Sequence, residues 1–223
     1  MADLTINVFD IVGPIMIGPS SSHTAGAVRL GKLARLIFGN EPKKADIFLH
    51  GSFAKTYKGH GTDVALVAGL LGFDPDDDRI SQALELAKNV GLEIKFIPAD
   101  LGSVHPNTVK FVLSGAKKTR TILGSSIGGG NIVVTQIDDF VVDLRGNYNT
   151  IIATYTDRTG MVASLSALLA EGKVNIAQMK VARVDKGAEA LMVIETDNPI
   201  DDITITKIRQ LEGIQSLFRI PPI

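Results

Sequence analysis

The sequence predicts an α+β protein built from two parts, and two observations support this. Residues 4–146 mix helical spacing with short runs of strand-forming residues, whereas residues 151–220 follow the order strand, helix, strand, strand, helix, strand. A turn-forming stretch at 143–150 separates the two patterns. With 223 residues, of which 45% are hydrophobic, the chain can build one large or two small cores. We therefore expect domains at 1–146 and 147–223.

The first part begins with an expected strand at 4–12 and reaches an unusual stretch of small polar residues. This stretch is Gly18-Pro19-Ser20-Ser21-Ser22-His23-Thr24-Ala25-Gly26. Residues 27–38 follow it with apolar side chains at 30, 33, 36 and 37, which is the spacing of an amphipathic helix. The serines therefore lie at a helix start, where free backbone N–H groups and a partial positive charge favour an anion such as a carboxylate.

Two interpretations of the serine stretch remain open. Serines before a helix are often only capping residues. An imidazole among four hydroxyls is more typical of proton-transfer chemistry, which favours an active centre around His23.

The remaining elements of the first part follow from periodicity and turn residues. A strand at 45–51 carries His50, for which a structural role is favoured, and the acidic run 74–78 is expected to cap a helix over 79–90. The glycines at 128–130 indicate a hairpin turn or a backbone-lined pocket wall. The other expected elements are a helix at 64–71 and strands at 92–97, 108–114, 119–126, 132–136 and 140–144.

Two further histidines lie in turn-rich segments. Gly59 and Gly61 flank His60, so backbone can approach a ligand closely there, and Thr62 or Asp63 is expected to cap the following helix. A plain glycine turn is the alternative, but the arrangement repeats that of His23 and favours a functional role. His105 precedes Pro106, which biases it toward extended geometry.

The second part has the ferredoxin-like supersecondary pattern. Strands are expected at 151–156, 174–184, 188–196 and 214–220, and the turn 185–187 joins the middle two. One helix carries Val162, Leu165, Leu168 and Leu169 on one side, and Asp201 or Asp202 caps the other. The two helices should cover one face of an antiparallel sheet.

Composition excludes several classes of function. A net charge of −1 lacks the basic footprint of a nucleic-acid-binding protein, and no apolar run approaches the ~20 residues that span a bilayer. The N-terminus has no signal-peptide pattern, so we expect a cytoplasmic protein. The sequence contains no cysteine, which excludes disulfides and thiolate metal sites within this chain. The sequence contains neither a P-loop nor the GxGxxG fingerprint of dinucleotide-binding proteins, so nucleotide binding is not expected.

Taken together, the motifs resemble those of the beta chain of iron–sulfur-dependent L-serine dehydratase along the whole sequence. The stretches that carry the resemblance are 18–26, Gly51-Ser52, Gly59-His60-Gly61-Thr62-Asp63, His105-Pro106-Asn107 and 124–130. Residues 147–223 resemble an ACT domain. The resemblance implies an N-terminal alpha/beta domain with a mixed sheet, followed by a ferredoxin-like βαββαβ ACT domain.

The resemblance also implies an activity. It predicts an L-serine ammonia-lyase that forms pyruvate and ammonia, active only with a separate alpha subunit whose cysteines hold a [4Fe-4S] cluster. It predicts no metal ligand on this chain. His60 is the expected general base, and His105 is its rival or partner as acid/base. The expected substrate-binding residues are Ser20, Ser21, Ser22, His23, Thr24 and Asn107.

For the second part, the resemblance implies a regulatory site and an interface. The expected effector-binding residues are Asp157, Arg158, Thr159 and Gly160. Unpaired sheet edges suggest a homodimer through the ACT domain when the chain is isolated. An alternative function stays open, namely a non-catalytic amino-acid-sensing module of the kind attached to phosphoglycerate dehydrogenase.

Overall fold

A computed structural model describes residues 15–223, so the strand expected at 4–12 lies outside the described residues. The chain forms two compact units that divide between Asp138 and Asp139, and each is described separately below. Within the described range, no helix is both long and apolar enough to cross a membrane.

The first sheet is mixed, as expected. Its strand order is β2-β1-β3-β4-β5-β6. Strand β1 pairs parallel with β2 and antiparallel with β3, and the pairs β3–β4 and β4–β5 are antiparallel. The strand bounds are β1 Lys44–Leu49, β2 Glu93–Pro98, β3 Thr108–Ser114, β4 Thr119–Gly128, β5 Asn131–Ile137 and β6 Phe140–Leu144.

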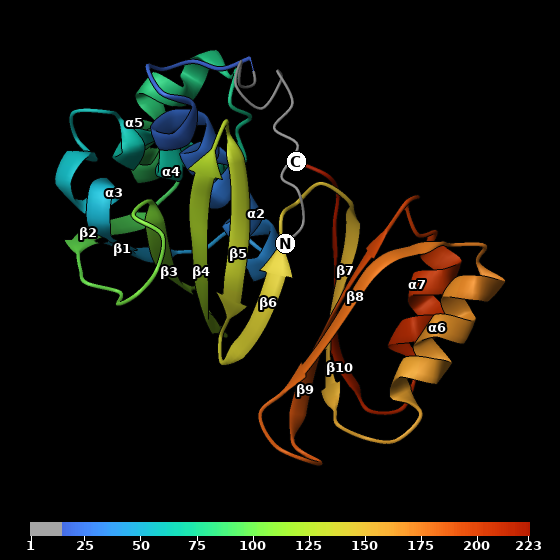
Figure 1. Cartoon of the computed structure of the whole chain (residues 1–223). Helices are drawn as coiled ribbons and strands as arrows, with labels where there is room; N and C mark the ends of the chain where they lie inside the picture. The colour runs from blue at the N-terminus through green and yellow to red at the C-terminus, as the bar shows by residue number, and fades with distance from the viewer. Residues whose placement is uncertain (1–14) are drawn as a thin grey trace, which may run out of the picture. The chain divides into compact units, whose positions relative to one another are not determined.

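Helices α2 and α4 lie on one side of this sheet (Figure 1). The helical elements of the first unit are η1 Ser21–Ala25, α2 Gly26–Phe38, α3 Gly51–Thr56, α4 Thr62–Leu71, η2 Asp78–Gln82 and α5 Ala83–Asn89. The helix expected at 27–38 is thus confirmed, and the π-helical turn η1 extends it toward the serines. Helix α2 ends at Gly39, whose φ is 79°.

Helices α2 and α4 touch backbone to backbone. A Cβ atom on Gly31 would overlap the carbonyl oxygen of Leu66, and one on Gly69 would overlap that of Val28. Only glycine at both positions lets the two helix backbones approach this closely. Helix α2, which begins at the serine stretch, is therefore held closely against α4, which begins two residues after His60.

Three expectations for the first unit need correction. Helix α4 begins at Thr62, and its N-cap is Gly61, whose φ is 67°, so neither Thr62 nor Asp63 is the N-cap residue. The carboxylate of Asp63 does accept a hydrogen bond from the N–H of Val64 at 2.9 Å within the first turn. The turn supplies the helix start instead. The helix expected at 79–90 is divided into η2 and α5, although Asp77 caps η2 by accepting a hydrogen bond from the backbone N–H of Arg79. Helix α3 was not anticipated.

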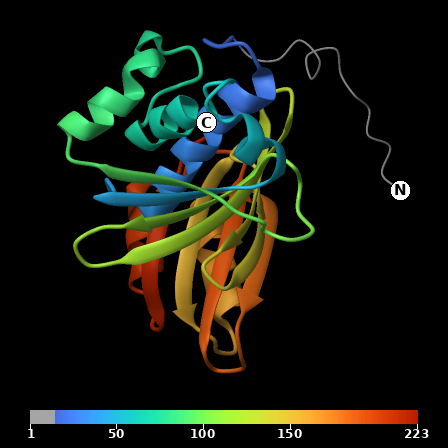
Figure 2. The same cartoon turned by 90° about the vertical axis from the view of Figure 1, so that its left-hand side faces the viewer.

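The second unit has the expected ferredoxin-like topology. Its antiparallel sheet has the order β10-β7-β9-β8, and the strands run side by side in Figures 1 and 2. Asp201 caps α7 by accepting a hydrogen bond from the N–H of Thr204 at 2.8 Å, which confirms one of the two expected caps. The bounds are β7 Asn149–Thr156, α6 Met161–Glu171, β8 Ile176–Arg183, β9 Glu189–Thr196, α7 Asp202–Arg209 and β10 Ile214–Ile220.

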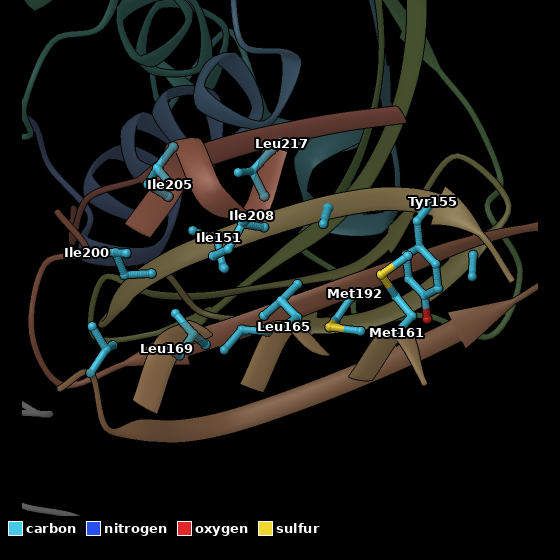
Figure 3. Close-up of a cluster of buried hydrophobic side chains, with 14 residues drawn as sticks. Ile151, Tyr155, Met161, Leu165, Leu169, Met192, Ile200, Ile205, Ile208 and Leu217 are labelled. Carbon is cyan, nitrogen blue, oxygen red and sulfur yellow. The ribbon is translucent and has the colours of Figure 1, made fainter. Parts of the chain in front are cut away.

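Helices α6 and α7 bury their apolar sides on one face of this sheet (Figure 3). Leu165 and Leu169 of α6 belong to the same buried cluster as Ile205 and Ile208 of α7. The strands contribute alternate residues to the cluster, such as Ile151, Ala153, Tyr155, Met192 and Ile194. The predicted side of α6 is therefore confirmed at Leu165 and Leu169, and Leu168 packs against the cluster. The prediction is wrong at Val162, which is exposed.

Candidate active site

The serine stretch starts the first helix by capping it. Ser20 is the N-cap, and its Oγ accepts a hydrogen bond from the N–H of His23 at 3.2 Å. The following turn is π-helical over Ser21–Ala25, a rare geometry that is frequent at functional sites. Ser21 and Ser22 are half-buried in this turn, so their hydroxyls remain near the surface.

Thr24 and Ser126 carry buried hydroxyls that have no hydrogen-bond partner. Thr24 is 4% exposed, and Gly18 packs so closely over it that a Cβ on Gly18 would overlap its side chain. Gly26 packs equally closely on Ser126. These glycines of the motif 18–26 therefore let the chain close tightly around the helix start.

His23 is buried, and it joins three segments that are distant in the sequence. Its Nε2 lies 3.1 Å from the Oγ of Ser52. Its ring lies 5.3 Å from the ring of Phe53 and 4.9 Å from that of His60, both edge-on. Burial, and then the neighbouring imidazole of His60, lower the pKa of His23, which favours a neutral ring at pH 7.

Helix α3 and the turn after it place Ser52 and His60 together. The Oγ1 of Thr56 donates to the carbonyl of Ser52 at 2.8 Å, and the N–H of His60 donates to the carbonyl of Thr56 at 3.0 Å. Ser52 in α3 and His60 in the turn after it both lie against His23. His60 is exposed and precedes α4, as expected of a residue at a helix N-terminus.

The loop that carries His105 docks on the start of α3. The N–H of Ser52 donates to the carbonyl of Pro106 at 2.8 Å. Gly51 has a φ of 55°, and a Cβ there would lie 2.6 Å from the same carbonyl oxygen. Asn107 accepts from the N–H of Ser126 and donates its own N–H to the Nδ1 of His105 at 3.1 Å. The exposed His105 is thus bonded within its own loop.

His50 and the glycines 128–130 have structural surroundings. The Nδ1 of His50 accepts a hydrogen bond from the N–H of Leu101 at 3.0 Å, which agrees with the favoured structural role. The glycines form the turn between β4 and β5, and all three have positive φ. Arg29 of α2 donates to the carbonyl of Gly130 at 2.9 Å, so the helix anchors this hairpin turn.

Comparison with known proteins agrees with this arrangement of motifs. The profile of a family described as "Serine dehydratase beta chain" matches residues 7–137, which is more than half of the chain. The chain belongs to this family. A relative named "Probable L-serine dehydratase, beta chain" from Bacillus subtilis is 46% identical, and the match covers 96% of this chain and 97% of the relative. The "L-serine dehydratase, beta chain" of Peptoniphilus asaccharolyticus is 42% identical over 88% of this chain and 89% of its own length.

A solved ACT domain is also similar to part of this beta chain. It comes from the GTP pyrophosphokinase of Chlorobium tepidum, and the match covers 32% of this chain and 83% of that domain, with 17% identity and a TM-score of 0.27. The ferredoxin-like assignment of the second unit is carried by its strand order and by the placement of its helices.

This beta chain has no thiolate that could bind an iron–sulfur cluster. It has no cysteine, and residues 15–223 contain no group of three or more histidine, aspartate or glutamate side chains that could hold a metal. A cluster held by thiolates would need cysteines from another chain.

The expected effector loop already makes several bonds. The carboxylate of Asp157 accepts hydrogen bonds from Arg183 at 2.9 Å and from the N–H of Gly187 at 3.1 Å. The N–H of Gly187, and then Arg183, lower the pKa of Asp157. Arg158 pairs with Glu212 at 2.7 Å. Gly160 precedes α6 with a φ of 90° and no side-chain cap, which leaves the helix start open beside Thr159.

Sequence reasoning left four residues of this region without a role. Ser52 and Ser126 lay in motifs that carried the resemblance, whereas Phe53 and Thr56 lay outside them. The spacing of four between Ser52, Thr56 and His60 was the available signal, because it predicts a helix that aligns them. The burial of Ser126 depends on the pairing of β4 with its neighbours, which the sequence does not reveal.

Proposed function

We propose that this chain is the beta subunit of an L-serine ammonia-lyase that converts L-serine into pyruvate and ammonia. The names of the two beta-chain relatives support the substrate and the reaction. The observation that carries the proposal is the meeting of His23, Ser52 and His60, which come from three separate motifs. A module that only sensed amino acids would not need two imidazoles in contact.

In this proposal His60 removes the proton from the Cα of serine. A neutral imidazole can accept a proton at an unprotonated ring nitrogen. His60 is exposed at the end of a turn and can meet a substrate held outside this chain. His23 is buried behind it and supports one side of its ring. His105 remains the rival or partner acid/base.

The start of α2 would receive the substrate carboxylate. Ser21 and Ser22 are half-buried beside the helix start, where hydroxyl and N–H donors favour an anion. The hydroxyl of Ser20 is already bonded to the N–H of His23, and Thr24 is enclosed under Gly18. Within the expected set, Ser20 and Thr24 would therefore shape the site, while Ser21, Ser22 and Asn107 would contact the substrate.

The proposed assembly includes a separate alpha subunit whose cysteines hold a [4Fe-4S] cluster. Such a cluster supplies a Lewis acid that helps the substrate hydroxyl to leave. The complete lack of cysteine in this chain is compatible with that division of labour. The beta chain would contribute binding groups and the base.

Replacing His60 tests the proposed base. With a candidate alpha subunit co-expressed under anaerobic conditions, His60→Ala should lower pyruvate formation by about 10²–10⁴-fold, the usual contribution of a general base. Lys58→Ala is a matched control, because it alters the same exposed turn and removes no imidazole. Cluster absorbance should persist in both variants. A wild-type kcat for His60→Ala, with the complex intact, would remove His60 from this role.

We also propose that the second unit binds an amino acid at Asp157, Arg158, Thr159 and Gly160 and forms a homodimer through its sheet edges. The open start of α6 next to Gly160 supports a site for a carboxylate. Strands β10 and β8 are the edge strands of that sheet.

A further inference from the structure

We infer that Ser52 is a positioning residue that holds the imidazole of His23 in the orientation at which it contacts His60. The inference rests on the proposed function only where it concerns the reaction rate. Its structural core is the 3.1 Å contact between the Oγ of Ser52 and the Nε2 of His23.

The position of Ser52 is determined from both sides by its backbone. Its N–H donates to the carbonyl of Pro106, and its carbonyl accepts from the Oγ1 of Thr56. Gly51 allows the loop of Pro106 to approach closely enough for the first bond. The backbone of Ser52 is therefore held in place, and only rotation about its χ1 torsion is needed to bring the hydroxyl to the imidazole.

The ring of His23 depends on this hydroxyl for its orientation. Its two aromatic neighbours, Phe53 and His60, approach it edge-on, and such contacts are weakly directional. The χ2 torsion of a histidine is broad by itself, so packing alone does not select one ring flip. A hydrogen bond to Nε2 selects one flip, because the carbon atoms of the ring cannot make it; the hydroxyl can act as donor or acceptor, so the bond fixes the ring orientation with either tautomer.

The same hydroxyl connects the imidazole pair to the loop of His105. Ser52 is bonded through its backbone to Pro106, which lies between His105 and Asn107. A shift of that loop would move Ser52 and, through it, the ring of His23. Errors in placement of about 1 Å are enough to lower an enzymatic rate about 10²-fold.

Nuclear magnetic resonance of the full chain tests the structural part without any activity. The sequence has four histidines, so labelled imidazole nitrogens can be resolved and assigned by substitution. Wild-type His23 should show the Nε2 shift of a hydrogen-bonded ring nitrogen. Ser52→Ala removes this hydrogen bond and should move the Nε2 shift of His23, whereas Ser52→Thr keeps the hydroxyl and should keep the wild-type shift.

A matched serine provides the control for this measurement. Ser114 has a hydroxyl bonded to Thr119 near the end of β3, and Ser114→Ala should leave the His23 shifts unchanged. If Ser52→Ala also leaves them unchanged in a folded protein, the inference is wrong. That result would say nothing against the proposed reaction.

Kinetics with the alpha subunit test the consequence for the reaction. Ser52→Ala should lower kcat by about 10–10²-fold with KM within about twofold, and Ser52→Thr should restore most of kcat. Equal losses in both variants, at unchanged melting temperature, would overturn the positioning role. No pyruvate formation by the wild-type complex would instead contradict the proposed function and leave the resonance result standing.

Discussion

The two imidazoles in contact at the candidate site have different surroundings at the scale of single residues. His23 is 9% exposed and bonded to Ser52, whereas His60 is exposed on a turn. Burial lowers the pKa of His23, which suits a supporting residue that stays neutral. The exposed ring is the one that a substrate can reach.

Glu195 gives a second residue-scale consequence, in the second unit. It is 4% exposed on β9, and its Oε1 has no hydrogen-bond partner. Burial, and then the carboxylate of Asp143, raise its pKa above the ordinary 4.5, although Arg145 partly opposes this. The folded chain therefore favours the protonated form of Glu195 more than the unfolded chain does.

The sign of the pH dependence follows from this shift. As pH rises above about 4.5, the unfolded chain loses this proton before the folded chain does. The free energy of unfolding therefore falls as the pH rises from that value through the raised pKa of the folded chain. Glu195→Gln keeps the shape without the charge. It should raise the melting temperature at pH 8 more than at pH 4.

Thermal melts at the two pH values check this prediction. Glu189→Gln, on the exposed start of the same strand, is the matched control and should show no comparable gain. The prediction would be contradicted if the difference in melting temperature between Glu195→Gln and wild type were the same at both pH values.

At the scale of elements, the crossing of α2 and α4 positions the site. The serine stretch precedes α2, and His60 precedes α4, so the crossing at Gly31 and Gly69 limits how far these ends can move relative to each other. The sequence shows both glycines but not their contact.

Gly69→Ala tests this crossing. Alanine normally stabilises a helix interior by about 1 kcal/mol relative to glycine, but the new methyl group would overlap the carbonyl oxygen of Val28. We expect a net loss of about 1–3 kcal/mol in the free energy of unfolding, typical of overpacking. Denaturant unfolding measures it.

Gly59→Ala is the control for this substitution, because the nearest atom to its new Cβ would be the Thr56 carbonyl oxygen at 3.8 Å. It should be close to neutral. Equal stability of Gly69→Ala and wild type would mean that the helices separate easily.

At the scale of the whole molecule, the second unit is a complete ferredoxin-like sheet whose proposed role is regulatory. Calorimetric titration of the full chain with L-serine should give binding heat that Asp157→Asn weakens at least severalfold. The amide cannot keep the ion pair with Arg183 that orders this loop. Asp185→Asn, in the exposed hairpin turn nearby, should bind as wild type does.

Sedimentation of the same samples measures the proposed homodimer. An absence of binding heat in the wild-type chain would count against the effector site. A monomer at all accessible concentrations would count against the homodimer.

Most elements could be predicted from the sequence because their signals are local. The apolar spacing in the sequence predicts α2, and the predicted limits of β3 and β6 agree with those in the structure. The turn residues of the second unit mark the ends of its strands. Helix α3 was not predicted because its six residues are too few to show a helical periodicity of apolar side chains. In addition, Gly51 at its start resembles the end of a strand. The cap of α4 was misjudged because a glycine turn replaces a side-chain cap.

By itself, the sequence determined the family, the order of elements and the small set of hydroxyl- and imidazole-bearing loops. Only the tertiary structure decided that His23 meets His60 and Ser52, while the ring of His105 is bonded within its own loop. The reason is that periodicity records the neighbours of a residue along one element. Contacts between distant loops depend on strand pairing and on how closely two helices approach. Local sequence patterns predict neither of these.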